Sequence, residues 1–440
     1  MPFKKKLERW IYQYDEELIN SPNRRNQDAF IIQIIFANAF TILTGGEFMT
    51  GFAIHLGAPD TLLGYIPLLG NIGGISLIFF GVLLEQFTRR KKLAITLNSI
   101  TKPLLVSVVL IPLFVPKHLQ ATVLFIILFV AYTLNSFLGL AVNSWFVNII
   151  PIGIRGRYFS VRQIYAVLVM VFLPVIGGSV LDVTHDVYWG FVIVFAAAFL
   201  FGGGETFAFS KLEDAVVKNM GKDIRLLDVF RIPIKDKEFM GYTIRSMIFH
   251  IVLYLSASYS QVYMIKYLGL SYTFITSMIM LNAVVQMIAY SRWGRIGDKY
   301  GHDFVIGLSF WFYAAQMLLW ALTSKGSMYI TVPLVHIISS FSSSGYTVGS
   351  FNHRYSILPE KGRSFYDAFY SAAVGVALII GPWAGGRIKD FMGGIDFIQT
   401  KIQFGEFRII FAMSALGLIV LSSLIFLGWR KMRKESNEFL

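Results

Sequence analysis

Three ionisable side chains lie deep inside apolar stretches of this 440-residue chain, where charge is costly and a functional role is the default explanation. The first is Glu47, which follows two glycines in the segment TGGEF at 44–48. The glycines loosen a helix there, and a carboxyl group removed from water can take up and release a proton. Glu47 is therefore the candidate for proton coupling. The alternative is that it faces an outer vestibule and titrates normally.

The other two side chains are histidines, His250 and His336, each near the middle of its apolar stretch. Imidazole ionises near neutral pH, so either ring can bind a polar substrate or relay a proton. The alternative is a ring satisfied by a neighbouring backbone carbonyl. Amides and a phenol at similar depth add hydrogen-bonding capacity, although such groups also hold helices together. The candidate residues of a substrate cavity are Asn38, Asn135, His250, Tyr254, Asn282, Gln286 and His336.

Other charges within or beside the apolar stretches have structural explanations. Lys102 lies about 13 Å inside its stretch at 1.5 Å per residue, so it either reaches back to the interface or pairs with an acid. We expect Arg245, which is shallower, to reach the interface, and Glu205 to be structural. The basic run at 90–92 is expected to be a set of solvated loop charges.

The apolar stretches are typical of membrane-spanning helices. Hydrophobic residues make up 55% of the chain and charged residues 15%, whereas a soluble domain is nearer a quarter charged. A helix needs about 20 apolar residues to cross a bilayer. Twelve runs of suitable length fall at about 28–56, 60–84, 93–115, 118–148, 163–182, 187–209, 239–265, 270–292, 303–322, 326–350, 365–386 and 407–429.

The runs are arranged as six, a charged linker and six. The expected domains are a cytoplasmic N-terminal segment at 1–27, a six-helix bundle at 28–209, a cytoplasmic linker at 210–238, a second six-helix bundle at 239–429 and a cytoplasmic tail at 430–440. In the first segment, Trp10, Ile11, Tyr12 and Leu18 suit a short amphipathic helix on the inner membrane surface. The expected fold is an all-α integral membrane protein with twelve transmembrane helices in two pseudo-symmetric bundles.

The orientation of the chain follows from its positive charges. There are 39 Lys and Arg against 26 Asp and Glu. Thirty of these basic residues fall on one side of the predicted spans and seven on the other, and two lie inside spans. Because basic residues are retained in the cytoplasm, both termini are expected there, in a multi-pass protein of the plasma (inner) membrane.

The two halves of the chain repeat each other at a spacing of 208–213 residues. A Pro-x-x-Gly-Gly-x-x-x-Asp pattern at 174–182 returns at 382–390, and the segment 81–90 corresponds to 294–302. Matches in equivalent places indicate two bundles of common design. Small residues let helices approach closely, so the first pattern is assigned to helix packing. Its residues are Pro174, Gly177, Gly178, Pro382, Gly385 and Gly386.

The segment GRIGDKYGH at 294–302 resembles the signature loop of the major facilitator superfamily, with a glycine, an acid, a basic residue and a second glycine in order. The copy in the first half departs from that loop, since Glu85 replaces the usual Asp and no glycine precedes Arg89. The resemblance covers nearly the whole chain. It implies two bundles around a central cavity that opens alternately to each side, and a monomer.

The same loop implies a latch on the cytoplasmic face. An acid at the end of a helix can accept hydrogen bonds from the N-terminus of a neighbouring helix and pair with an arginine. Such a contact holds one face closed and breaks when the bundles rock. The alternative is a set of solvated loop charges. The candidate residues of the latch are Glu85, Arg89, Gly294, Arg295, Asp298, Lys299 and Gly301.

Several classes of function are disfavoured by what the sequence lacks. With no cysteine, the chain has no disulfide, thiolate metal site or cysteine nucleophile. It has no P-loop, no His-Glu-x-x-His zinc motif and no Gly-x-Ser-x-Gly nucleophile motif. We therefore expect no direct ATP drive, no metal site, no cofactor and no enzymatic activity. An integral-membrane enzyme is the remote alternative.

The expected function is secondary active transport of a small organic solute by alternating access. The expected partners are a small-molecule substrate, protons or another coupling ion, and the lipid bilayer, with no nucleic acid. Polar side chains at middle depth favour a symporter, in which protons drive uptake of a sugar or related polar metabolite. The aromatic content of 16% and the few buried charges favour the alternative, efflux of drug-like or lipid-like amphiphiles by proton antiport.

Overall fold

The computed structural model describes residues 24–84, 87, 89–149, 152–184, 186–214, 226–358, 363–395, 398 and 403–438. These residues are helical apart from short connections and contain no β-strand, which confirms the all-α fold. They divide into two compact units, each described here by itself. Unit 1 comprises Met1–Ala58 and Ser76–Leu226, and unit 2 comprises Pro59–Ile75 and Leu227–Leu440. The amphipathic helix expected within 1–27 falls mainly on residues outside the described ranges.

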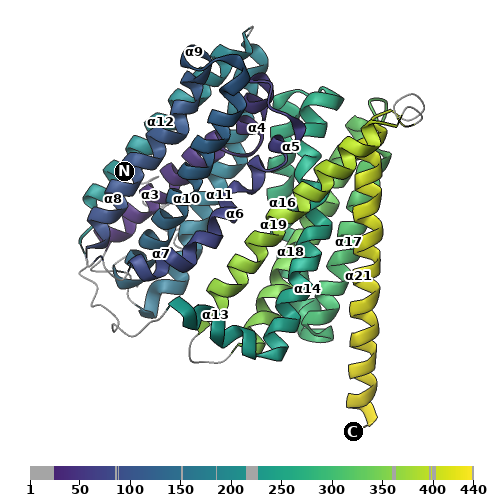
Figure 1. The fold of residues 1–440 in the computed structure, drawn as a ribbon. Helices are drawn as coiled ribbons and strands as arrows, with labels where there is room; N and C mark the ends of the chain where they lie inside the picture. The colour runs from purple at the N-terminus through teal and green to yellow at the C-terminus, as the bar shows by residue number, and fades with distance from the viewer. Residues whose placement is uncertain are drawn as a thin grey trace, which may run out of the picture. The chain divides into compact units, whose positions relative to one another are not determined.

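Unit 1 is built on long helices that bury one face against each other. α3 packs on α11 and α12, and α8 packs on α10 and α12 (Figure 1). Aromatic rings fill the core between these helices. Phe30 of α3 meets Trp145 of α10 edge-on, with ring centroids 5.8 Å apart. The helices are α3 (Arg24–Thr44), α4 (Gly46–His55), α7 (Leu77–Leu84), α8 (Arg90–Val106), η3 (Ser107–Leu110), α9 (Ile111–Phe114), α10 (Lys117–Ile149), α11 (Ile152–Val183) and α12 (Val187–Lys211).

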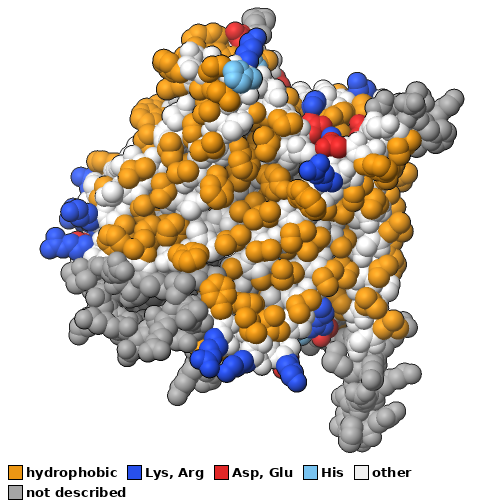
Figure 2. All heavy atoms as spheres, in the orientation of Figure 1, with side chains coloured by type: hydrophobic (Ala, Val, Ile, Leu, Met, Phe, Trp, Pro, Cys, Tyr) orange, Lys and Arg blue, Asp and Glu red, His pale blue; other side chains and the backbone are white. Residues whose placement is uncertain are grey.

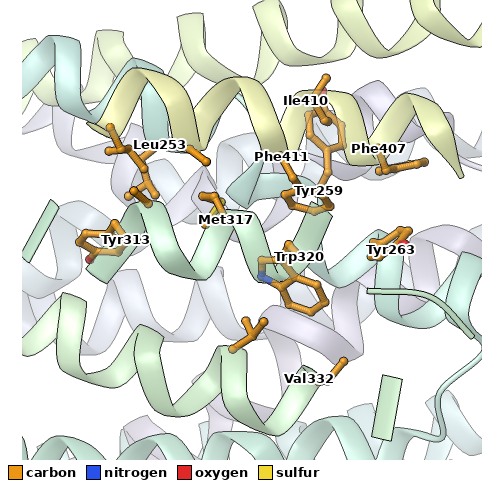
Figure 3. Packing of buried hydrophobic residues seen from close by; sticks show 14 of the residues in the cluster. Leu253, Tyr259, Tyr263, Tyr313, Met317, Trp320, Val332, Phe407, Ile410 and Phe411 are labelled. Carbon is orange, nitrogen blue, oxygen red and sulfur yellow. The ribbon is translucent and has the colours of Figure 1, made fainter. Parts of the chain in front are cut away.

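Unit 2 has the same kind of construction. α17 packs on both α18 and α21, α16 packs on α18, and α14 packs on α19. Figure 3 shows its core, where Trp320, Phe407 and Phe411 gather around Tyr263 with no exposed surface beyond a few per cent. The helices after the linker are α13 (Leu226–Lys235), α14 (Lys237–Tyr254), η4 (Ala257–Tyr259), α15 (Ser260–Val262), η5 (Tyr263–Leu268), α16 (Tyr272–Tyr300), α17 (His302–Leu322), α18 (Met328–Ile357), α19 (Arg363–Gly393) and α21 (Gly405–Glu438).

Nine helical segments of the described residues are long and apolar enough to cross a membrane, and each matches one of the predicted runs. The runs at 60–84, 163–182 and 326–350 are not among them. Among the described residues, the apolar stretch of α11 is Leu168–Val183, and α18 carries the serine-rich sequence SSFSSS at 339–344, which lowers its hydropathy. The multi-pass membrane fold is therefore shown, and the count of twelve spans stays a prediction.

The run at 60–84 does not form one helix. Pro67 and several glycines divide it into α5 (Asp60–Leu63), η1 (Ile66–Leu68), α6 (Leu69–Ile72), η2 (Gly73–Ser76) and α7. Its first part, Pro59–Ile75, packs with unit 2 and the remainder with unit 1, whereas the sequence places the whole run in the first bundle.

Apolar side chains also cover the outer faces of the helices. Figure 2 shows hydrophobic groups along the helix lengths, with Lys and Arg gathered near helix ends. Phe114 is 79% exposed and Leu200 is 75% exposed. A surface of this kind is stable against lipid hydrocarbon, which matches the nine apolar segments.

Candidate functional site

The first membrane-spanning segment of unit 1 is broken beside Glu47. α3 ends at Thr44, and α4 begins at Gly46, whose φ of +48° falls in the left-handed region that favours glycine. The hydroxyl of Tyr132 donates to the Thr44 carbonyl at 3.4 Å and so satisfies part of the helix end. Glu47 lies in the first turn of α4, where the positive end of the helix dipole favours a carboxylate.

Unit 2 has a break at the corresponding place. α14 ends at Tyr254, and the helix resumes at Ala257 as η4. The breaks at Gly45 and Leu255 are 210 residues apart, which is the spacing of the sequence repeat. The Ser258 hydroxyl donates to the Tyr254 carbonyl at 3.0 Å, so a local side chain serves the freed backbone group. Interrupted helices at corresponding positions of two repeats are a strong indication of a substrate-binding region.

The glycine-proline motif of α19 packs directly on this second break. A Cβ added to Gly385 would lie 1.8 Å from the carbonyl oxygen of Leu255, so only glycine fits there. The hydroxyl of Tyr259 donates to the Pro382 carbonyl at 2.7 Å, and a Cβ added to Gly386 would lie 2.7 Å from that hydroxyl.

The matching motif of α11 makes a similar close contact within unit 1. A Cβ added to Gly177 would lie 2.7 Å from the ring of Phe48, one residue after Glu47. Gly178 and Pro174, in the same part of α11, are also buried. A side chain at Gly177, Gly385 or Gly386 would therefore collide with a neighbouring residue.

Several cavity candidates come together between α16 and α18. Asn282 Nδ2 lies 3.0 Å from His336 Nδ1, and the Ser340 hydroxyl donates to Asn282 Oδ1 at 2.9 Å. One helical turn further along, Gln286 Nε2 donates to the Ser343 hydroxyl at 3.5 Å. These residues form a half-buried column of amides, hydroxyls and an imidazole inside an apolar unit.

His250 and Tyr254 lie on α14, one turn apart, with parallel rings 6.2 Å apart. His250 Nδ1 lies 2.7 Å from the carbonyl oxygen of Ser246, which can only accept. Nδ1 therefore carries the proton in the neutral ring, and Nε2 is the atom that can accept one. The ring meets Tyr346 of α18 at 5.8 Å, so α14 joins the polar column near that residue.

The two histidines offer opposite hydrogen-bonding roles. With the Asn282 amide donating to Nδ1 of His336, the neutral His336 ring carries its proton on Nε2. This Nε2 is buried without a hydrogen-bonding partner among the described residues. A buried polar atom without a partner is costly, so a ligand acceptor at this point would be stabilising.

Asn38 and Asn135 lie in unit 1. Asn38 Nδ2 donates to the carbonyl of Ile34 in its own helix at 2.8 Å. Asn135 Oδ1 accepts from the Lys102 ammonium at 3.5 Å. Each is therefore partly engaged by neighbours in its own unit.

A buried ionic network runs through unit 1. Lys102 Nζ lies 3.2 Å from Glu205 Oε2, and Gln33 Nε2 donates to the other carboxylate oxygen at 2.8 Å. Arg162 donates to Gln33 Oε1 at 2.9 Å, and both ends of the network are more than 90% buried. Lys102 thus pairs with an acid rather than reaching the interface. Gln33 and Arg162 are functional candidates that the sequence does not reveal.

The latch candidates are placed at helix ends. Asp298, Arg295 and Lys299 are exposed in the last two turns of α16, and Gly301 ends that helix with a φ of +87°. Gly294, half-buried, lies one turn earlier. Arg89 is exposed at the start of α8, and Glu85 lies outside the described residues.

The expectation of solvated charges at 90–92 is wrong for two of the three residues. Arg90 is fully buried and donates to the Leu84 carbonyl, which closes the turn between α7 and α8. Lys91 Nζ donates to the carbonyls of Ser210 at 2.8 Å and Leu212 at 2.6 Å. A cation there stabilises the negative end of α12.

A second charged cluster, in unit 2, has no signal in the sequence. Asp60, 8% exposed, accepts from Lys266 at 2.7 Å, from Tyr267 at 2.6 Å and from Lys389 at 3.2 Å. Nearby, the Tyr65 hydroxyl donates to the Ile379 carbonyl at 3.1 Å. Together these bonds hold Pro59–Ile75 against α19 and explain why this segment belongs to unit 2.

Comparison with known proteins agrees with this architecture. Residues 238–439 match the family model described as Major Facilitator Superfamily. The chain is 30% identical over 127 residues to the tetracycline resistance protein, class H, of Pasteurella multocida, an alignment that covers 29% of this chain and 30% of that relative. The chain thus matches less than a third of that relative's length.

The fold is also that of solved transporters. The nucleoside transporter NupG superposes with a TM-score of 0.66 at 12% identity, covering 92% of this chain and 98% of that one. A D-xylose-proton symporter superposes with a TM-score of 0.64 at 13% identity, covering 91% of this chain and 97% of that one. At these identities the likeness concerns the fold alone.

Proposed function

We propose that this chain is a secondary transporter of the major facilitator superfamily, which moves a small organic solute across a membrane by alternating access. The observation that carries the proposal is the pair of helix breaks at Gly45 and Leu255, in corresponding places of the two repeats. Each break has chemistry beside it, a carboxyl group in Glu47 and the imidazole and phenol of His250 and Tyr254. Broken helices of this kind bind solutes and coupling ions in secondary transporters.

The polar column of unit 2 favours a solute rich in hydrogen-bonding groups. Asn282, Gln286 and His336 offer donors and acceptors on one side of two adjacent helices. The solute is a sugar or a related polar metabolite, and protons drive its uptake with Glu47 as the coupling residue. Asn38 and Asn135 are the candidates for contacts from unit 1.

A second function is favoured by one specific observation. The 127-residue similarity to a tetracycline resistance protein supports efflux of drug-like or lipid-like amphiphiles by proton antiport. The two functions differ in ligand and direction. If several amphiphiles and no polar solute raise the melting temperature of the protein, efflux replaces uptake as the proposed function.

We expect His336→Leu to weaken binding of the polar solute by about tenfold. The ligand loses the N–H donor at Nε2 of His336, and the Asn282 amide loses Nδ1 as its acceptor. Binding is measured as the ligand-dependent rise in melting temperature, followed by the fluorescence of the eight tryptophans. His118→Leu is the matched control, since His118 is exposed at the start of α10. Unchanged affinity in the His336 variant would remove this residue from the site.

We expect Asp298→Asn to slow transport several-fold while largely sparing solute affinity. The signature loop implies that this carboxylate latches the cytoplasmic face, and its place at the end of α16 suits that role. Initial rates of uptake and the binding constant are measured on the same preparation. Unchanged turnover would rule out the latch.

The remaining expectations complete the proposal. The protein works as a monomer with twelve spans in the plasma (inner) membrane, with both termini in the cytoplasm. The excess of basic residues on one side of the spans supports that orientation. Cleavage of the C-terminal tail by a protease added outside intact cells would contradict this orientation.

A further inference from the structure

One face of α18 is polar from the middle of the helix to its C-terminal end. Its residues recur every three or four positions, which places them on the same side of the helix. The residues of this polar face are His336, Ser340, Ser343, Tyr346, Ser350 and His353. The face extends over 18 residues, from His336 to His353, or roughly 26 Å at 1.5 Å per residue. Such a length exceeds half of a bilayer core, so the face links mid-membrane groups to the end expected in the cytoplasm.

A small cavity lies beside the middle of this face. It has a volume of about 30 Å³ and is lined by residues of α14, α17, α18 and α21, namely Tyr242, Arg245, Ser246, Asp303, Ile306, Phe310, Tyr346 and Ile425. The Tyr346 hydroxyl is buried and makes no direct hydrogen bond to the described residues, and the hydroxyls of Ser246 and Tyr370 lie close to it. A cavity of this volume holds one or two waters when two to four polar groups reach it. The Tyr346 hydroxyl supplies one such group, and Asp303 and Ser246 supply others.

At its far end the cavity meets an acid–imidazole pair. Asp303 Oδ1 lies 3.3 Å from His353 Nδ1, and the His353 ring stacks on Tyr242 at 5.3 Å. Burial lowers the pKa of His353, and the nearby Arg245 and His302 lower it further, while Asp303 and Glu238 oppose them. The lowered pKa favours the neutral ring of His353, which can accept a proton.

We propose that the cavity holds water and that Tyr346, this water, Asp303 and His353 form the route by which the coupling proton passes between His250, a second protonation site besides Glu47, and the cytoplasm. The proposal rests on the proton-coupled function. Protonated His250 gives the proton on Nε2 to the Tyr346 oxygen as that hydroxyl gives its own proton to the cavity water. The water passes a proton to Asp303, whose neighbour His353 exchanges it with solvent. Tyr346, the water, Asp303 and His353 each gain one proton and lose one, and His250 is left neutral and able to accept the next proton.

The geometry explains why a water is needed. Eight residues of α14 separate His250 from Tyr242, or roughly 12 Å. A hydrogen bond spans about 2.8 Å, so no single side chain links the two levels. The Tyr346 hydroxyl and the water-sized cavity lie between the levels of His250 and Tyr242.

The test uses Tyr346→Phe, which removes only the hydroxyl and keeps the ring packed on Phe249 at 4.4 Å. Asp303→Asn is the second variant, and Tyr313→Phe is the matched control, a buried tyrosine of α17 that does not line the cavity. The purified protein is reconstituted in phosphatidylethanolamine–phosphatidylglycerol vesicles. Labelled xylose, uridine and tetracycline are the probes, and the one that the wild type accumulates under a pH gradient is used for the variants.

Gradient-driven uptake is expected to fall about tenfold in Tyr346→Phe and Asp303→Asn, while exchange of labelled for unlabelled solute at equal pH stays within twofold of the wild type. Exchange requires binding and rocking but no net proton transfer. Unchanged gradient-driven uptake in both variants would overturn the route, and so would an equal loss of exchange. A wild type that accumulates no probe under the gradient would instead count against the proposed function.

Discussion

Glu205→Gln is expected to lower the free energy of unfolding by about 3–5 kcal/mol, the cost of removing one partner of a buried ion pair. Lys102 and Glu205 side chains are 5% and 3% exposed, so water cannot replace the lost interaction. The glutamine keeps the size of the side chain, and its amide oxygen can still accept from Gln33. The loss is therefore electrostatic, because Lys102 and Arg162 remain buried without an anion.

The measurement is the melting temperature of the purified protein, followed by tryptophan fluorescence. Glu213→Gln is the control, since Glu213 is exposed just beyond α12 and its loss should leave the melting temperature unchanged. Adding Lys102→Met to Glu205→Gln should restore part of the stability, because removing both charges avoids an unpaired ion. A Glu205 variant with the melting temperature of the wild type would show that the network does not stabilise unit 1.

Glu47→Gln is expected to abolish accumulation of solute against its gradient. With one proton per solute, a gradient of one pH unit supplies about 1.4 kcal/mol, enough for roughly tenfold accumulation. Glutamine cannot ionise, so it keeps the place at the start of α4 without carrying the proton. Uptake down a solute gradient should continue, since binding does not need the charge.

The steady-state ratio of solute inside to outside is measured in vesicles whose interior is more alkaline than the medium. The wild type should reach a ratio near ten and the Glu47 variant a ratio near one. Asp214→Asn is the control, since Asp214 is an exposed acid outside the spans. Full accumulation by Glu47→Gln would remove the coupling role.

Much of the fold follows from hydropathy alone. The nine apolar helical segments match predicted runs because burying a helix in hydrocarbon depends on composition more than on neighbours. The match of residues 238–439 to the family model agrees with the superfamily resemblance carried by the loop at 294–302. The fold is that of solved transporters. The run at 60–84 is the exception, since its hydropathy does not reveal that Pro67 and the glycines divide the helix.

Site residues follow from the sequence only where their type stands out against an apolar background. Asn282 and His336 are conspicuous for that reason, but their hydrogen bond depends on how α16 packs on α18. Arg162 and Arg90 look like loop cations because each lies in a cluster of basic residues. Their burial results from the packing of the helices, so the neighbouring sequence does not predict it.

Solute flux in sealed vesicles distinguishes a transporter from a receptor or an enzyme. The wild-type protein is reconstituted, a proton gradient is imposed, and the content of labelled xylose, uridine and tetracycline is followed with and without an ionophore that collapses the gradient. A secondary transporter should accumulate at least one of these solutes, and the ionophore should abolish the accumulation. A solute that raises the melting temperature but is not moved across the membrane would show a receptor. A solute that is chemically converted would show an enzyme, and either result would contradict secondary transport.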